Sequence, residues 1–178
     1  MAATIGNFSS GDVLTAAQMD TLGLEFLDDQ TFTGYGGVSS DVLSSDFTHY
    51  MVQWFGTNAN ISAVSLQFRR SGSQITTNNY NYGTNGVTFS TSAAFTNAAQ
   101  NTNIFRLGSV STGGSFMSMF LTLGYDNVAM ATWQLNVQNL ETWQGSGHFD
   151  DGSAVTGLRI ARSSGLTTMR MRVYGLRN

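Results

Sequence analysis

The feature that most constrains the fold of this chain is a period-two alternation of apolar and polar side chains in several short segments. In "AVSLQFRR" (63–70), Val64, Leu66 and Phe68 alternate with polar residues. The segments "AMATWQLNV" (129–137) and "TTMRMRVYG" (167–175) alternate in the same way. Because successive side chains of a strand point to opposite faces, these segments are predicted to be half-buried antiparallel strands.

Further segments extend this pattern. "HYMVQWFG" (49–56) is apolar on both faces, so we expect another sheet or another subunit to cover each face, and "SFMSMFLTLGY" (115–125) also alternates. Weaker strands are expected near 31–38, 87–90, 104–107 and 158–162. Eight or nine short strands with turns rich in Gly, Asn and Ser are typical of a sandwich or barrel. We predict an all-β, antiparallel β-sandwich of jelly-roll type with a short N-terminal helix.

The predicted helix covers residues 15–28, where the apolar spacing changes to that of a helix. Thr15 suits the N-cap, and Gln18 completes a capping box. We expect the helix to attach to a partner or to copies of itself, or to close one end of its own sandwich. Residues 1–30 are thus assigned to an attachment arm and 31–178 to the sandwich domain. The predicted attachment residues are Leu14, Met19, Leu22, Phe26 and Leu27.

Charge is sparse and unevenly distributed. Residues 1–50 hold seven acidic residues and no basic one, whereas the rest of the chain holds four acidic residues and eight Arg. This asymmetry fits an acidic contact arm on a mildly basic body, or equally acids at a helix start and in turns. Arg162, Arg170 and Arg172 are expected to share one strand face, either solvated or against an acidic subunit. A net charge of −3 without Lys argues against nucleic-acid binding.

The sequence also argues against a membrane span, disulfide bonds and a metal site. No apolar run approaches 18 residues, so no membrane span is expected, and the first residues lack the pattern of a signal peptide. The absence of Cys excludes disulfides and thiolate metal sites. His49 and His148 have no metal-binding spacing, so neither a metal ion nor a cofactor is expected.

We predict that the chain is not an enzyme, because no nucleophile elbow or phosphate-binding loop is present. One alternative stays open, in which Glu141 and Asp150 form the carboxylate pair of a glycosidase.

Aromatic residues make up 12% of the chain. Glycan sites combine exposed rings with amides and hydroxyls, because sugar rings have apolar faces and polar rims. Residues 71–86 form the longest predicted polar loop. The candidate glycan-binding residues are Asn79, Tyr80 and Tyr82 in this loop, and Trp143 in "LETWQGSG". The alternative is that these rings belong to the core or to a subunit contact.

Three segments resemble structural proteins of tailed bacteriophages. "GDVLTAAQMDTLG" (11–23) is similar to the G-x-V-L-T-A-x-x-x-N-x-L segment of tail and fibre proteins, with Asp20 in place of the commoner Asn. The closing "TTMRMRVYGLRN" is similar to the V-Y-G-x-R/K ending of small β-sandwich domains on phage virions. "FRRSGSQITTNNYNYG" (68–83) resembles the middle of the same domains.

The resemblance implies a virion protein and a homotrimer. We expect a tail-fibre or receptor-binding component that contacts host-surface glycan and neighbouring virion proteins. The alternative is a capsid decoration protein bound to the major capsid protein.

Overall fold

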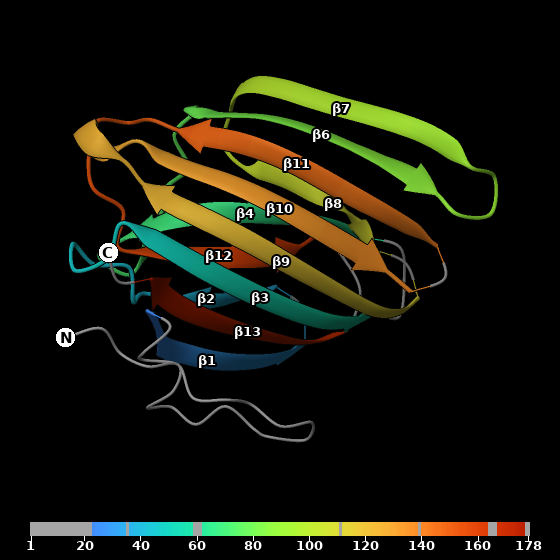
Figure 1. Cartoon of the computed structure of the whole chain (residues 1–178), viewed down its shortest axis with the longest axis horizontal. Helices are drawn as coiled ribbons and strands as arrows, with labels where there is room; N and C mark the ends of the chain where they lie inside the picture. The colour runs from blue at the N-terminus through green and yellow to red at the C-terminus, as the bar shows by residue number, and fades with distance from the viewer. Residues whose placement is uncertain are drawn as a thin grey trace.

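Two antiparallel sheets packed face to face form the computed structural model, which describes residues 23–34, 36–58, 62–110, 112–138, 140–163 and 167–176 (Figure 1). The larger sheet has eight strands in the order β1-β13-β3-β9-β10-β11-β6-β7, and the smaller has the order β2-β12-β4-β5, with β8 also paired to β4. The predicted all-β antiparallel sandwich is therefore confirmed. No helix of the described part is long and apolar enough to cross a membrane.

The strands of the larger sheet are β1 (Leu24–Gly34), β13 (Thr167–Leu176), β3 (His49–Asn58), β9 (Gly113–Leu123), β10 (Ala129–Val137), β11 (Glu141–Phe149), β6 (Tyr80–Thr88) and β7 (Ala93–Thr102). Those of the smaller sheet are β2 (Gly37–Ser40), β12 (Gly157–Arg162), β4 (Ser62–Arg70), β5 (Ser73–Gln74) and β8 (Phe105–Val110). A short 3-10 turn, Tyr125–Asn127, links β9 to β10.

The core lies between the two sheets and is filled by the alternating apolar residues. On β3, Tyr50, Val52 and Trp54 are fully buried, whereas Phe55 points away from the core and is 38% exposed. On β4 of the facing sheet, Leu66 is fully buried. The period-two analysis therefore identified these strands and their inward faces correctly.

The predicted helix is wrong for the part of it that the structure describes. Residues 24–28 belong to β1, which pairs along its length with β13. A register shift between Phe26 and Asp28 marks a β-bulge. Phe26 lies on the outer face and Leu27 packs against the core, as successive residues of a strand do, and Leu27 is the extra residue of the bulge. Pairing with β13 thus outweighs the helical spacing, and β1 crosses the domain boundary expected at residue 30.

Residues 14, 19 and 22, the other predicted attachment positions, lie outside the described residues.

Strands β5, β7 and β11 were missed, and β6 was misplaced. The weak strand expected near 31–38 spans the end of β1 and the start of β2. The weak strand expected near 87–90 is the end of β6 and the following turn, and 71–86 is not one loop because β5 and most of β6 lie in it. On β11 the alternation is hidden, since two inward positions are glycines, Gly145 and Gly147. Without side chains there, the sequence shows no apolar period.

These glycines make room for aromatic rings beneath β11. A Cβ on Gly145 would lie 2.5 Å from the Trp133 ring, and one on Gly147 would lie 2.8 Å from the Phe105 ring. The Trp133 indole Nε1 donates a hydrogen bond to the Leu107 carbonyl on the smaller sheet at 2.9 Å. The rings thus pack directly against the β11 backbone and tie the two sheets together.

A matched pair of glycine variants tests this packing. A Cβ on Gly83 would meet nothing within 4 Å. We expect Gly145→Ala to lower the free energy of unfolding by roughly 1–3 kcal/mol through overpacking. Gly83→Ala should leave it unchanged or raise it by up to about 1 kcal/mol. Denaturant unfolding of both variants measures the difference, and equal values would contradict the ring packing.

Candidate functional site

An extended hollow surface lies on the outer face of the larger sheet, over β10, β11, β6 and β7. These four strands lie side by side in the sheet (Figure 1). Three adjoining hollows of about 830, 620 and 270 Å³ share lining residues and form one trough. We define the trough by the lining residues Asn81, Gly83, Asn85, Thr96, Ala98, Thr132, Gln134, Gln144, Ser146 and His148.

Strand register arranges these residues in rows across the sheet. One row is Thr132, Ser146, Gly83 and Ala98, and the next is Gln134, Gln144, Asn85 and Thr96. Directly opposed residues have Cβ atoms about 4.5–5.5 Å apart. The first row is therefore a shallow floor of small side chains, and the second is a line of amides and a hydroxyl beside it.

The residues that define the trough include no Asp, Glu or Arg, and they include one histidine, His148. The Asn101 backbone N–H donates to Asn81 Oδ1 at 3.0 Å, which fixes the orientation of the Asn81 amide. Asn81 Nδ2 then faces His148 Nε2 at 3.3 Å. Since an amide nitrogen only donates, we assign Nε2 as the acceptor, which places the neutral ring's proton on Nδ1.

Two apolar side chains border the trough on the side of β9 and β10. Phe120 is 54% exposed and stands opposite Thr132 on the neighbouring strand. Met130 is 48% exposed and lines the largest hollow beside His148. The trough therefore combines neutral donors and acceptors with an apolar margin, which suits ligand binding.

Of the predicted glycan-binding residues, Tyr82 lines the largest hollow of the trough, whereas Asn79, Tyr80 and Trp143 are not among the residues that line it. Tyr80 is fully buried between the sheets, and its hydroxyl accepts a hydrogen bond from the Phe68 N–H at 2.8 Å. Trp143 is 8% exposed and lies 4.1 Å from the Phe95 ring, centroid to centroid. Both side chains are core residues, which is the alternative left open from the sequence. Their apolar rings stabilise the sandwich because they are shielded from water.

The other two candidates lie nearer the surface. Tyr82 is half-buried, with its ring 6.5 Å from that of Phe105. Asn79 is half-buried and its carbonyl accepts a 3.4 Å hydrogen bond from the Asp150 N–H. The trough itself was missed because its residues are small and individually common. The available signal was the clustering of Gly, Ala, Asn, Gln and Thr in 93–102 and 141–149.

The proposed carboxylate pair of a glycosidase is wrong. Glu141 begins β11 and Asp150 follows its last residue, so the strand separates them by roughly 30 Å. A glycosidase requires about 5–10 Å. Among the described residues there is no group of three or more His, Asp or Glu side chains that could hold a metal ion.

The three arginines expected on one strand face are divided between the sheets. Arg162 ends β12 of the smaller sheet, whereas Arg170 and Arg172 lie on β13 of the larger one. Asp29 on β1 accepts hydrogen bonds from Arg170 Nε at 2.7 Å and from Arg172 Nε at 3.3 Å. The hydrogen bond from Arg170, more than the contact with Arg172, lowers the pKa of Asp29.

The buried position of Tyr80 makes stability depend on pH. Burial raises the pKa of Tyr80 to about 12, whereas an unfolded tyrosine ionises near a pKa of about 10. Ionisation is thus easier in the unfolded chain. The free energy of unfolding should therefore fall as pH rises from about 10 to about 12, by at most roughly 3 kcal/mol from this group.

Tyr80→Phe tests this contribution. At pH 8 we expect it to lower the free energy of unfolding by about 1–3 kcal/mol, because the buried Phe68 N–H loses its acceptor. Tyr174→Phe, on the outer face, should change it by less than about 0.5 kcal/mol. The alkaline decrease should become shallower in Tyr80→Phe but persist, since burial also raises the pKa of Tyr50. An unchanged decrease would contradict the assignment to Tyr80.

No protein-family model and no curated protein matches the chain. Two solved structures of mutants of the alginate lyase Aly36B align with it. The complex with alginate trisaccharide aligns at 9% identity and a TM-score of 0.32 over 99% of this chain and 97% of that one. The complex with alginate tetrasaccharide aligns at 10% identity and a TM-score of 0.29, over 84% of this chain and 80% of that one. An aerolysin-like protein from Bombina maxima aligns at 6% identity and 0.11 over 80% of this chain and 93% of that one. None of these matches places the chain in a family.

Proposed function

We propose that this chain is a non-enzymatic structural protein of a tailed-bacteriophage virion that binds host-surface glycan in the trough. In this proposal it is a homotrimeric tail-fibre or receptor-binding component with a jelly-roll sandwich. The observation that supports glycan binding is the uncharged trough with its apolar margin. The virion origin rests on the sequence segments described above. The jelly-roll type is supported by the pairing of strands far apart in sequence, such as β1 with β13.

The trough suits a neutral or weakly charged saccharide chain. Asn85, Gln144 and Ser146 present amides and a hydroxyl that both donate and accept, which matches sugar hydroxyl groups. Met130, which lines the largest hollow, gives an apolar surface for a sugar face. From His148 to Thr142, the trough follows β11 over roughly 20 Å, long enough for several sugar rings.

Filling the trough should abolish binding without unfolding the protein. Gly83→Tyr places a ring on the floor, where a Cβ meets no neighbour. We expect at least a tenfold loss of binding to host cells or to purified host envelope glycan. Ser73→Tyr is the matched control, because Ser73 is exposed on the other sheet, and it should bind normally. Fluorescent protein titrated onto cells measures both.

Equal binding by Gly83→Tyr and Ser73→Tyr would reject the trough as the contact. Absence of wild-type binding to host cells and to the glycan would reject receptor binding as the function.

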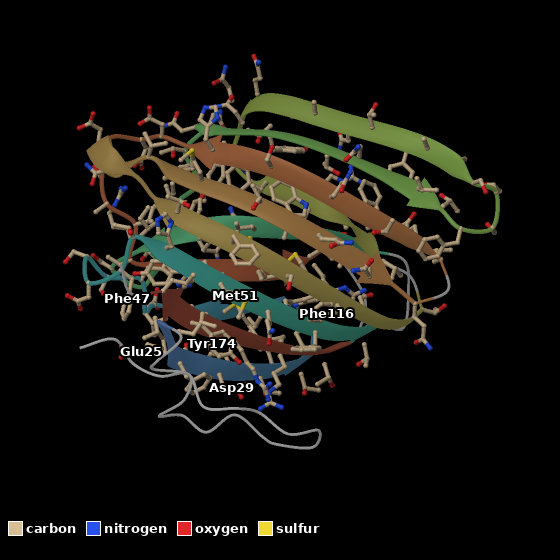
Figure 2. The ribbon with its side chains drawn as sticks, viewed as in Figure 1. Glu25, Asp29, Phe47, Met51, Phe116 and Tyr174 are labelled. Carbon is tan, nitrogen blue, oxygen red and sulfur yellow. The ribbon has the colours of Figure 1, made fainter. Side chains whose placement is uncertain are left out.

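Contact between copies of the chain is proposed for an apolar band on the other half of the same face. The band comprises Phe26, Met51, Phe55, Phe116, Phe120 and Tyr174, which come from β1, β3, β9 and β13. Figure 2 shows Tyr174, Met51 and Phe116 on this face, with Asp29 nearby on β1. The Phe26 and Tyr174 rings are 5.7 Å apart.

The register makes the band continuous. Phe26 lies opposite Tyr174, Tyr174 opposite Met51, and Met51 opposite Phe120, so one apolar row crosses four strands. Asp29, Arg170 and Arg172 form a row of ion pairs beside it. A band of this kind, with charged groups at its side, resembles the apolar centre and polar margin of a subunit interface.

An oligomeric-state measurement tests the band. Phe26→Asp introduces a charge where the side chain is 50% exposed, and we expect it to convert trimers to monomers. Phe89→Asp changes a residue that is 53% exposed and outside the band, so it should remain trimeric. Light scattering after size-exclusion chromatography distinguishes the states. A trimeric Phe26→Asp variant would exclude Phe26 from the contact, and a monomeric wild type would reject the trimer.

The second candidate function is capsid decoration, in which the same band would bind the major capsid protein. The exposure of Phe26, one of the predicted attachment residues, favours it. Immunogold labelling of virions separates the two candidates, since label at the tail tip supports receptor binding and label over the head supports decoration. Unlabelled particles would reject the virion assignment.

A further inference from the structure

We infer that a hollow on the outer face of the smaller sheet binds the anionic group of an acidic saccharide. The hollow measures about 380 Å³. Three of its lining residues are arginines, Arg106 on β8 and Arg159 and Arg162 on β12. The lining residues Ser65 and Gln67 come from β4, which lies between β8 and β12. This surface is on the opposite side of the sandwich from the trough, and the inference does not depend on the trough.

The register of β4 brings two of these arginines to one surface. Ser65 pairs with Arg106 on β8 and with Ala161 on β12, while Gln67 pairs with Arg159. The Cα atoms of Arg106 and Arg159 are therefore two strands apart and offset by two residues, which is roughly 12 Å. The small side chains of Ser65 and Ala161 lie between them and leave the hollow open.

The hollow is cationic and its lining residues include no Asp or Glu. Asp41, on the neighbouring loop, is bound to Arg69 Nε at 2.8 Å and Arg69 Nη2 at 3.0 Å. No ion pair joins Arg106 or Arg159 to a carboxylate within the described ranges. Burial, followed by the charge of Arg69, lowers the pKa of Arg159, and burial lowers the pKa of Arg162. An anion in the hollow would offset this accumulation of positive charge.

Other lining groups suit a saccharide around the anion. Ser163 is held in place, because its hydroxyl accepts a hydrogen bond from the Ala63 N–H at 3.2 Å. Ala63, Ile104 and Ala161 form small apolar surfaces at the hollow. Guanidinium groups bind carboxylate, sulfate and phosphate oxygens in the same forked geometry. The shared ligand chemistry is therefore an oxyanion carried by a sugar, either a uronate carboxylate or a sulfate ester.

Calorimetric titration of the full chain at low salt tests the inference. The probes are hexagalacturonate, a sulfated heparin hexasaccharide and neutral maltohexaose. We expect saturable binding of at least one acidic probe, at least tenfold tighter than any binding of maltohexaose. Arg106→Gln and Arg159→Gln should each weaken it by about fivefold to tenfold. Arg170→Gln removes one charge from the other sheet and should leave affinity within twofold.

Tighter binding of hexagalacturonate would identify a uronate carboxylate as the bound group, and tighter binding of the heparin hexasaccharide would identify a sulfate ester. Equal affinities for acidic and neutral probes, or equal losses in Arg170→Gln and Arg159→Gln, would overturn the inference. Because Arg106 is exposed, Arg106→Gln should fold. If either variant does not fold, NMR of the arginine Nε–H groups in the wild type tests the inference. The acidic probe must then shift the resonances of Arg106 and Arg159 more than that of Arg170. Gly83→Tyr should bind the acidic probe normally, which separates this site from the trough.

Discussion

Aromatic rings packed between the two sheets determine the position of the β11 backbone and of the outer surface that this strand carries. Trp133 and Phe105 lie directly under the backbone of Gly145 and Gly147. The Tyr80 hydroxyl on the larger sheet accepts a hydrogen bond from Phe68 on the smaller one. Trp133 and Tyr80 each combine a large buried apolar surface with a hydrogen bond between the sheets, whereas Phe105 contributes apolar surface alone. The trough floor is the outer side of this packing, so its position depends on residues that no ligand touches.

Sequence periodicity predicts the strands that carry at least three apolar side chains in succession at inward positions. β3, β4, β9, β10 and β13 are of this kind, and each was located correctly. β11 was missed because its inward glycines leave space for rings from β10 and β8, which a single strand's sequence does not reveal. The start of β1 was taken for a helix because Phe26 and Leu27 continue a helical apolar spacing, which pairing with β13 outweighs. Both failures come from contacts with other strands, which the sequence of one segment does not show.

The same limit applies to the candidate site. Tyr80 and Trp143 drew attention as aromatic residues near polar ones, yet the sandwich uses both as core. The trough residues stand together only because register aligns β10, β11, β6 and β7. The arginines of the last two strands show the opposite, because residues close together in the sequence lie on different sheets. The sequence shows which residue types could bind a ligand, whereas the strand order determines which of them lie together on one surface.

Strand order also has a mechanical consequence. The apolar band occupies one end of the eight-stranded sheet and the trough occupies the other. If the band is anchored and the trough holds a surface, tension runs across the strands, along the direction of their hydrogen bonds. The ladder between β10 and β9 contains nine residue pairs, and the one between β3 and β9 contains ten. Under that load all bonds of a ladder carry the tension together, so separating two strands requires every pair of the ladder to break.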